Sequence, residues 1–282
     1  MKLVSYKGDN GPAWGVVNGN LVAEVSASLG DEWPDLAAMI AAGGMARVAA
    51  AVGNAPTRSL DGLAFLPVVS NPSKILCIGV NYAMHREEMG RSAFEEPTVF
   101  TRFADTLIGH DDAIGLPAIS HELDYEGELA IIIGRGGRAI DAADALDHIA
   151  GFTCFNDATL RDWQRHSSQF TPGKNFPRTG PLGPWLVTPD EMGALPDQRL
   201  QTRLNGEVVQ DTVLADMIFD VPKIIAYCSA FTPLRPGDVI ATGTPAGVGA
   251  KRKPPLWMKP GDVVEVEIDG IGCLRNTIAP FE

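Results

Sequence analysis

The sequence has few cysteines, and none of them is spaced as a pair. Four cysteines are spread over 282 residues, at positions 77, 154, 228 and 273. Neither a disulfide framework nor a cysteine-ligated zinc site is indicated, because both need paired or numerous cysteines. Cys77 and Cys154 lie inside apolar segments, and we expect both to be buried, reduced thiols.

Basic residues are also scarce. Lysine and arginine total 23 against 35 aspartates and glutamates, which gives a formal net charge of −12. The one basic run, at 251–253, is too short to form a stripe. This balance argues against nucleic acid or an anionic membrane as a partner. A small anionic substrate would need a local cation, such as a bound metal ion.

Long apolar runs and several common catalytic motifs are missing. No stretch approaches the roughly 20 residues that span a bilayer, and the N-terminus has no signal-peptide pattern, so we expect a cytoplasmic protein. The chain has no GxSxG elbow, no HExxH motif and no internal repeat. The glycine-rich segment 243–249 lacks nucleotide-binding spacing, but its amides and the Thr242 and Thr244 hydroxyls could bind a carboxylate.

The remaining composition, 45% apolar and 21% charged, is typical of a folded protein with one large core or two unequal ones. In residues 1–70, short alternating segments flank Asn18 and Gly19, a pair that predicts a hairpin. Asp35 is a predicted N-cap for a helix over 36–40, and residues 56–72 are a predicted connector. We therefore predict a small N-terminal α/β domain over 1–70, without catalytic residues, and a catalytic domain over 71–282.

The segment 123–134, LDYEGELAIIIG, combines two closely spaced glutamates with an apolar run. Its second half is a continuous apolar run closed by glycine, which predicts a buried strand. If that strand extends back to Tyr125, its period of two places Glu126 and Glu128 on one face. In a dry site, one carboxylate must take up a proton or a divalent cation must bind both. Such ligands favour magnesium, manganese or calcium; the alternative is two solvated glutamates.

Three further segments carry candidate side chains. Asn81 is the predicted N-cap of a helix on which His85 and Glu88 lie within hydrogen-bonding reach, although such pairs also occur on surfaces. Asp157 follows a predicted strand and is either a third carboxylate or a helix N-cap. Lys174 stands in a segment rich in glycine and proline, where a rigid loop can fix its ammonium group.

The last third of the chain is rich in β signals. Asn205 and Gly206 predict a second hairpin turn, and residues 222–231 predict a helix. Residues 238–242 predict a strand that leads into the glycine-rich segment. The alternation over 263–272 predicts an antiparallel hairpin.

Together these segments resemble the fumarylacetoacetate hydrolase family over residues 71–279. The segments that carry the resemblance are, in order, IGVNY at 78–82 with His85 and Glu88, LDYEGEL at 123–129, FND at 155–157, RDWQ at 161–164, GKNF at 173–176, GPLGPW at 180–185, TGTP at 242–245 and GIG at 270–272. The resemblance implies an α+β fold, built as a mostly-β mixed-sheet roll behind the small N-terminal α/β domain. It also implies a homodimer and a bound Mg²⁺ or Mn²⁺.

The resemblance also implies roles for individual residues. Three acids are metal ligands, three residues act in catalysis and four contact the substrate: Glu126, Glu128 and Asp157; His85, Glu88 and Lys174; and Tyr82, Gln164, Thr244 and Arg161. In this assignment His85 activates water with the help of Glu88, and Lys174 polarises the substrate. Two positions depart from the family pattern: Pro177 replaces an aspartate that often follows the lysine, and Arg102 stands near the place of a common Lys-Pro pair.

The reaction that this resemblance implies is hydrolysis of a carbon–carbon bond in a ketonic substrate. The expected substrate is an acylpyruvate, such as maleylpyruvate or fumarylpyruvate from aromatic catabolism, cleaved through a pyruvate enolate. Alternatives are oxaloacetate decarboxylation, isomerisation or decarboxylation of unsaturated dicarboxylic acids, and hydrolysis of a sugar-derived 2,4-dioxo acid. A catalytically inactive binding protein is disfavoured because every implied catalytic residue is present. The sequence leaves open which arginine meets a second carboxylate: Arg86, Arg161, Arg165 or Arg178.

Overall fold

The computed structural model describes all 282 residues, and its largest unit is a mixed sheet of eleven strands. Ten of them follow one another in the order β4 (Thr57–Ser59), β3 (Leu21–Ala23), β2 (Gly11–Asn18), β1 (Lys2–Gly8), β13 (Gly180–Val187), β11 (Ile149–Asn156), β10 (Gly127–Ile133), β16 (Val239–Ala241), β5 (Ile75–Gly79) and β6 (Thr98–Arg102). The eleventh, β7 (Leu107–Ile108), pairs in parallel with β13.

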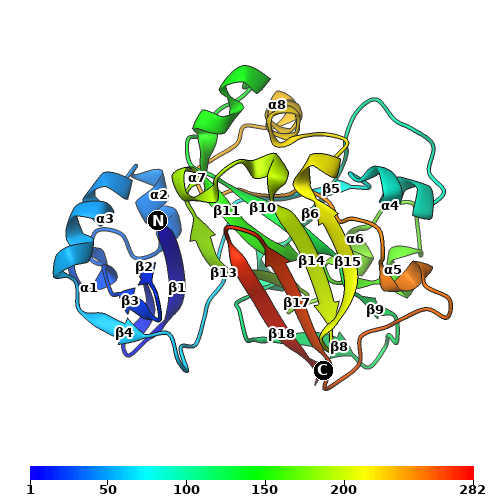
Figure 1. Cartoon of the computed structure of the whole chain (residues 1–282), viewed down its shortest axis with the longest axis horizontal. Coiled ribbons are helices and arrows are strands. Elements are labelled where there is room, and N and C mark those ends of the chain that lie inside the picture. Colours follow the sequence, from blue (N-terminus) through cyan, green and yellow to red (C-terminus); the bar gives the residue numbers. More distant parts are fainter.

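A second sheet of five strands lies in front of β10, β11 and β13 in Figure 1. Its order is β15 (Glu207–Val213), β14 (Arg199–Leu204), β17 (Val263–Ile268), β18 (Gly272–Phe281) and β8 (Ala113–Pro117). A short pair, β9 (Leu123–Asp124) with β12 (Thr159–Leu160), stands apart from both sheets. The expected α+β fold with large mixed sheets is confirmed.

The helices are short and lie around the sheets. The α-helices are α1 (Ser26–Leu29), α2 (Leu36–Ala41), α3 (Met45–Ala51), α4 (Ala83–Glu88), α5 (Arg161–Gln164), α6 (Thr171–Lys174), α7 (Pro189–Met192) and α8 (Val221–Phe231). The 3-10 helices are η1 (Val52–Asn54), η2 (Ala104–Thr106), η3 (Ala142–His148), η4 (Leu195–Asp197), η5 (Leu214–Asp216) and η6 (Gly249–Lys251). None of these helices has the length and hydropathy of a membrane-spanning segment.

Strand β10 is buried on both faces, as its apolar run predicts. Leu129, Ile131 and Ile133 pack into a core that includes α8 and the second sheet, whereas Ala130 and Ile132 pack into a core shared with β1 and α2. The alternation follows from the period of two along a strand. Because β10 also pairs with β11 and β16 on its two edges, it is fixed in every direction, and so are the residues at its start.

Several local predictions are confirmed. The hairpins at Asn18 and at Asn205 form, and the second places Asn205 and Gly206 at φ of 52° and 83°, which suits a two-residue hairpin turn. Asp35 caps α2 by accepting a hydrogen bond of 2.7 Å from the Ala38 amide. Cys77 and Cys154 are buried and free, as expected.

Three local predictions are wrong. Tyr82, rather than Asn81, stands at the N-cap of α4, because the Asn81 amide instead bonds backbone groups of Phe219 and Thr242. Lys174 ends the one-turn helix α6 and is not in a loop. The connector predicted over 56–72 contains β4, which pairs with β3.

Candidate active site

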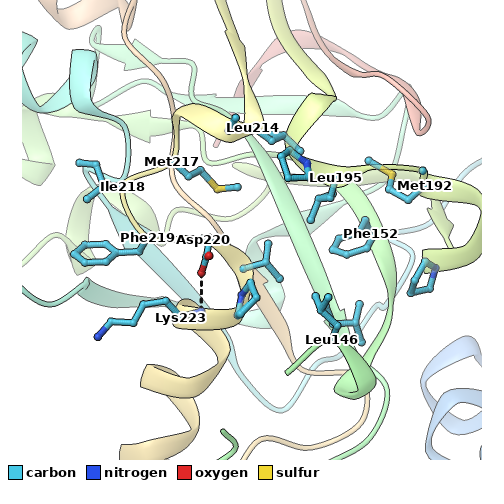
Figure 2. Close-up of a pocket in the computed structure, with 17 residues that line it drawn as sticks. Leu146, Phe152, Met192, Leu195, Leu214, Met217, Ile218, Phe219, Asp220 and Lys223 are labelled. Carbon is cyan, nitrogen blue, oxygen red and sulfur yellow. Dashed lines mark hydrogen bonds between the residues drawn. The ribbon is translucent and has the colours of Figure 1, made fainter. Parts of the chain in front are cut away.

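A polar cavity of about 550 Å³ opens beside the start of β10 and contains most of the predicted site residues. Glu126, Glu128, His85, Lys174 and Thr244 all line it. A larger cavity, of about 760 Å³, is lined mainly by apolar side chains such as Leu214 and Met217 (Figure 2). We therefore take the polar cavity as the candidate active site.

The larger cavity offers little for chemistry because its two ionisable side chains have structural partners. Asp220 caps α8 by accepting a hydrogen bond of 2.9 Å from the Lys223 amide. The Lys223 ammonium lies 3.1 Å from Glu96.

Three carboxylates form a cluster at the polar cavity, which Glu126 and Glu128 line and Asp157 does not. Each of Glu126, Glu128 and Asp157 is buried, and one oxygen from each lies within 4.8 Å of the others. The pairing of β10 with β11 brings them together, since Gly127 is opposite Asn156 and the Asp157 amide donates to the Glu126 carbonyl at 2.9 Å. The strand does not extend back through Glu126, which lies between β9 and β10, yet the two glutamates still converge.

The glycine between the two glutamates is required by packing. A Cβ at Gly127 would lie 2.1 Å from Thr202 Oγ1, on the second sheet. Glycine thus lets β14 approach β10 closely. The Glu-Gly-Glu spacing therefore places the carboxylates where the two sheets meet.

Two of the three carboxylates have cationic partners. Lys174 Nζ lies 2.6 Å from Glu126 Oε2 and 2.5 Å from Asp157 Oδ2. Arg102 Nη1 lies 2.5 Å from Asp157 Oδ1, and Arg161 Nη2 lies 2.5 Å from Glu126 Oε1. Burial alone would raise the pKa of Glu126, but the charges of Arg161 and Lys174 outweigh it and lower that pKa.

Glu128 has no cationic partner, and its environment is the opposite of that of Glu126. Its carboxylate accepts one hydrogen bond, of 2.9 Å, from the Gly243 amide. Burial, followed by the negative charges of Asp157 and Glu126, raises its pKa well above the ordinary value. A divalent cation would remove this penalty, and three hard oxygen donors are a suitable set for one. The residues therefore fit a divalent metal ion.

A histidine and a glutamate on α4 form a hydrogen-bonded pair at the same cavity. His85 Nδ1 lies 2.9 Å from Glu88 Oε2, and Glu88 Oε1 accepts a hydrogen bond of 3.1 Å from the Gly247 amide. Because an ionised carboxylate can only accept, Nδ1 carries the hydrogen and Nε2 remains a proton acceptor. His85 is only 4% exposed, so this tautomer is fixed in a largely dry place.

Three of the four predicted substrate-contacting residues line the cavity, and one does not. Arg161, Gln164 and Thr244 are lining residues, but Tyr82 is not. The Tyr82 hydroxyl is buried without a hydrogen-bond partner, and burial, then the charge of Glu128, raises its pKa. The Gln164 and Thr244 side chains also have protein partners, since they bond Arg161 and Gln210 respectively.

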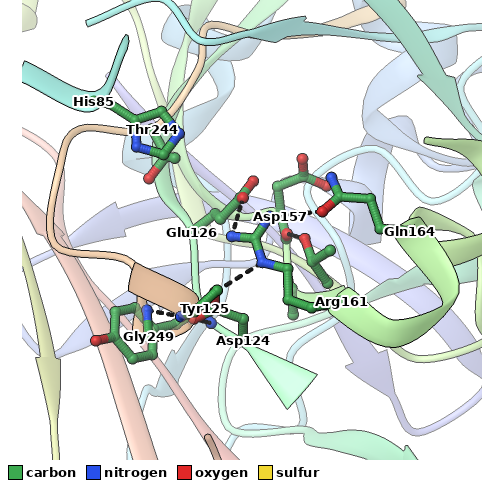
Figure 3. Close-up of polar contacts among 12 residues, drawn as sticks. His85, Asp124, Tyr125, Glu126, Asp157, Arg161, Gln164, Thr244 and Gly249 are labelled. Atoms are coloured by element: carbon green, nitrogen blue, oxygen red, sulfur yellow. Dashed lines mark hydrogen bonds and ion pairs between the residues drawn. The ribbon is translucent and has the colours of Figure 1, made fainter. Parts of the chain in front are cut away.

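Sequence reasoning missed the part played by Asp124. Its buried carboxylate accepts a hydrogen bond of 2.8 Å from Arg161 Nε and bonds of 2.7 and 3.0 Å from the Gly249 and Ala250 amides. Figure 3 shows the Arg161 guanidinium between Asp124 and Glu126. Asp124 thus fixes the arginine that neutralises Glu126. Its place in the acidic segment at 124–128 was the available signal.

The two departures from the family pattern also have structural outcomes. Arg102, left open by the sequence, is buried and binds Asp157 directly. Lys174 is held by Glu126 and Asp157 themselves, so an acid at the place of Pro177 is not needed to fix it.

Comparisons with known proteins show which family the chain belongs to. The profile of the family "Fumarylacetoacetate (FAA) hydrolase C-terminal" matches residues 74–279. The mitochondrial oxaloacetate tautomerase of Xenopus laevis is 42% identical over 222 residues, which is 78% of this chain and 70% of that protein.

Two solved structures are similar over the whole of both chains. The fumarylacetoacetate hydrolase of Exiguobacterium antarcticum is 36% identical with a TM-score of 0.90. The maleylpyruvate hydrolase of Sphingobium sp. SYK-6, in complex with manganese(II) and pyruvate, is 29% identical with a TM-score of 0.84. The sequence resemblance is thereby confirmed, and the chain belongs to the fumarylacetoacetate hydrolase family.

Proposed function

We propose that the protein is a divalent-metal-dependent enzyme that moves a proton at the carbon next to the 2-oxo group of a small 2-oxo acid. The reaction we favour is the enol–keto tautomerisation of oxaloacetate. The observation that carries the proposal is the placement of the His85–Glu88 pair and the three buried carboxylates around one cavity. The 42% identity to an oxaloacetate tautomerase supports this choice of substrate.

In this proposal Glu126, Glu128 and Asp157 hold Mg²⁺ or Mn²⁺. The cation, when bound, supplies a Lewis acid for the carboxylate and 2-oxo oxygens of the substrate. Lys174 and Arg161 keep Glu126 ionised and in place. Their positive charges also favour negative charge that develops on the substrate oxygens.

His85 is the proposed base and acid. In the keto-to-enol direction its Nε2 accepts a proton from C3, and a proton is returned to the oxygen at C2; the reverse direction exchanges the two transfers. Glu88 holds the ring through Nδ1 and stabilises the imidazolium that forms. The bond from the Gly247 amide fixes Glu88 in turn.

Hydrolysis of an acylpyruvate is the second candidate, and one observation favours it. The same Nε2 can take a proton from a water that attacks the distal carbonyl, and the chain is similar to a maleylpyruvate hydrolase along its full length. Cleavage would give pyruvate and a carboxylic acid, and maleylpyruvate or fumarylpyruvate would place the enzyme in aromatic catabolism.

The test is a set of assays on one preparation loaded with Mg²⁺ or Mn²⁺. Loss of the enol absorbance of oxaloacetate, above the spontaneous rate and without CO₂ release, supports tautomerisation. CO₂ release indicates decarboxylation, and loss of acylpyruvate absorbance with pyruvate formation indicates hydrolysis. No turnover of any of these compounds would reject the proposal.

Substitution of His85 tests its role directly. His85→Ala should lose turnover by on the order of 10² to 10⁴, the range for a general acid–base group, and keep Mn²⁺ binding by calorimetry. His121→Ala, at an exposed position, is the matched control and should retain full turnover. Loss of Mn²⁺ binding in His85→Ala would contradict the assignment.

The proposal includes a homodimer in the cytoplasm, as the sequence analysis expects. Light scattering after size-exclusion chromatography tests the dimer, and a single-chain mass would reject it. Cell fractionation tests the location.

A further inference from the structure

We propose that Arg91 is the residue that binds the second carboxylate of a dicarboxylic substrate such as oxaloacetate. The inference rests on the proposed function, because Arg91 lines the same cavity. It goes beyond that function by assigning Arg91, which is not among the four arginines that the sequence left open.

The charged residues that line the cavity fall into two groups. Its acidic residues are Glu126 and Glu128 alone, and they lie in the cluster with Arg161 and Lys174. The lining beyond that cluster has no acidic residue. It contains Arg91 and Arg165, together with the hydroxyls of Ser167 and Ser168. Because Arg165 pairs with Glu122, Arg91 supplies the free positive charge of this group, which suits an anionic ligand.

Of the cations that line the cavity, Arg91 is the one without an anionic partner. Arg161 is bound between Asp124 and Glu126, and Lys174 is bound to Glu126 and Asp157. Arg165 pairs with Glu122 at the edge of the cavity. Arg91 is exposed and makes no ion pair. Its guanidinium can therefore bind a carboxylate of the substrate without first breaking another contact.

Two of the arginines that the sequence left open, Arg86 and Arg178, do not line the cavity. Arg178 donates to the Ala113 carbonyl at 3.0 Å and does not line the cavity. Arg86 is also absent from the lining, although it lies on α4 near His85.

The C-terminal end of α4 determines the position of the Arg91 backbone. The Gly90 amide bonds the Glu87 carbonyl at 2.9 Å, and the Arg91 amide bonds the Arg86 carbonyl at 3.0 Å. These two bonds form a Schellman motif, which requires the left-handed conformation that Gly90 adopts, at φ of 66°. The helix that carries His85 therefore also fixes the backbone of Arg91.

The recognition chemistry follows from these observations. A guanidinium can bind a carboxylate through two parallel hydrogen bonds, a geometry that lysine cannot reproduce. A 2-oxo acid whose first carboxylate lies at the acidic cluster would present a second carboxylate toward Arg91. A monocarboxylic 2-oxo acid would leave Arg91 hydrated, so Arg91 would add little to its binding free energy.

The first test measures affinity without turnover. In the His85→Ala background with Mg²⁺, calorimetry compares oxaloacetate with pyruvate, which lacks the second carboxylate. We expect Arg91→Ala to weaken oxaloacetate binding by about tenfold and to leave pyruvate binding within about twofold. Arg91→Lys should recover only part of the loss, and Arg86→Ala, on the same helix, should behave as the parent protein.

The second test measures kcat/KM in the otherwise unchanged enzyme. Arg91→Ala should lower kcat/KM for oxaloacetate by about tenfold, mainly through KM, and leave that for acetylpyruvate unchanged. Equal losses on both substrates, or no loss on either, would overturn the subsite. Absence of turnover in the unsubstituted enzyme would reject the proposed function instead, whereas the binding comparison would still decide the subsite.

Discussion

Glu128 differs from the two carboxylates beside it in having no cation to balance its charge. Burial and its acidic neighbours raise its pKa, so the metal-free fold contains a carboxyl group in an unfavourable place. Removing the charge should relieve that cost and also remove a metal ligand. Substitution of Glu128 should therefore change folding stability and metal binding in opposite directions.

Glu128→Gln should raise the unfolding temperature of the metal-free protein. The same variant should also lose Mn²⁺ affinity. The loss should exceed the 10–100-fold that is typical when a residue that hydrogen-bonds a metal ligand is replaced. Thermal unfolding with chelator, followed by a Mn²⁺ titration, measures both effects. Glu95→Gln, at an exposed position, is the control and should change neither. If Mn²⁺ stabilises the Glu128→Gln protein as much as it stabilises the parent protein, Glu128 is not a metal ligand.

His110 gives a pH dependence that is independent of the active site. Its ring packs edge-on against Phe65, at 4.8 Å between centroids, and Nδ1 accepts a hydrogen bond of 3.1 Å from the Arg275 amide. Burial, opposed by the charge of Asp111, lowers the pKa of His110 below 6.5. The unfolded chain therefore binds the extra proton first as the pH falls.

The contribution of neutral His110 to the free energy of unfolding should be fully present above about pH 6.5. It should be lost progressively as the pH falls from there through the lowered pKa of His110 in the folded protein. His110→Asn keeps an acceptor for the Arg275 amide and cannot titrate in this range. Urea unfolding at a series of pH values should show a smaller loss of stability on acidification in the variant. Parallel curves for the two proteins would contradict this account.

At the residue scale, the sequence was informative where one segment contains several functional groups. Glu126 and Glu128 are predicted together because they lie two positions apart in one segment, although β10 itself begins only at Gly127. The contact of Arg102 with Asp157 spans 55 positions, and the contact of Arg161 with Asp124 spans 37. Such pairings depend on how strands are ordered, which a single sequence does not specify.

At the scale of elements, α4 is attached to the rest of the site through Glu88. One carboxylate oxygen accepts from His85 and the other from the Gly247 amide. The helix is only six residues long, too short to be stable by itself. Its position therefore depends on these contacts and on the hydrogen bonds that the Asn81 side chain makes with the backbone of Phe219.

Glu88→Gln should lower kcat on the order of tenfold to a hundredfold, less than loss of the base itself, with a smaller change in KM. An amide offers one accepting oxygen where the carboxylate offers two, so either His85 or Gly247 loses its partner. Hydrogen exchange of the α4 amides should quicken in the variant. Glu87→Gln, next to it on the helix, is the control; a Glu88→Gln enzyme with normal kcat would remove Glu88 from the mechanism.

The elements predicted correctly are those whose signals are local. Asp35 bonds an amide three residues away, and Asn205 and Gly206 adopt turn angles that their own chemistry favours. Asn81 has the same capping chemistry as Asp35, but Phe219 and Thr242 lie near enough to take its hydrogen bonds. The competing partners are more than 130 residues away in the sequence, so the error could not be detected locally.

At the scale of the whole molecule, the first 70 residues are joined to the remainder through one sheet. Strand β1 pairs with β13 at Lys2 and Leu3, and Figure 1 shows the N-terminal strands beside β13. Leu3 and Trp14 also share a core with Ile132 and Leu186. The predicted boundary at residue 70 remains a proposal, and the shared core indicates that the two parts depend on each other.

Deletion of residues 1–70 should therefore prevent residues 71–282 from folding. It would expose Ile132 and Leu186, which are fully buried, and leave β13 with an unpaired edge, a common cause of aggregation. We expect an aggregated product on size-exclusion chromatography that does not bind Mn²⁺. Co-expression of residues 1–70 as a separate chain should restore a soluble, Mn²⁺-binding complex, because the missing strand and core residues are supplied again. A deletion product that folds and binds Mn²⁺ alone would show instead that β10 and its carboxylates need only the second sheet and α8 for support.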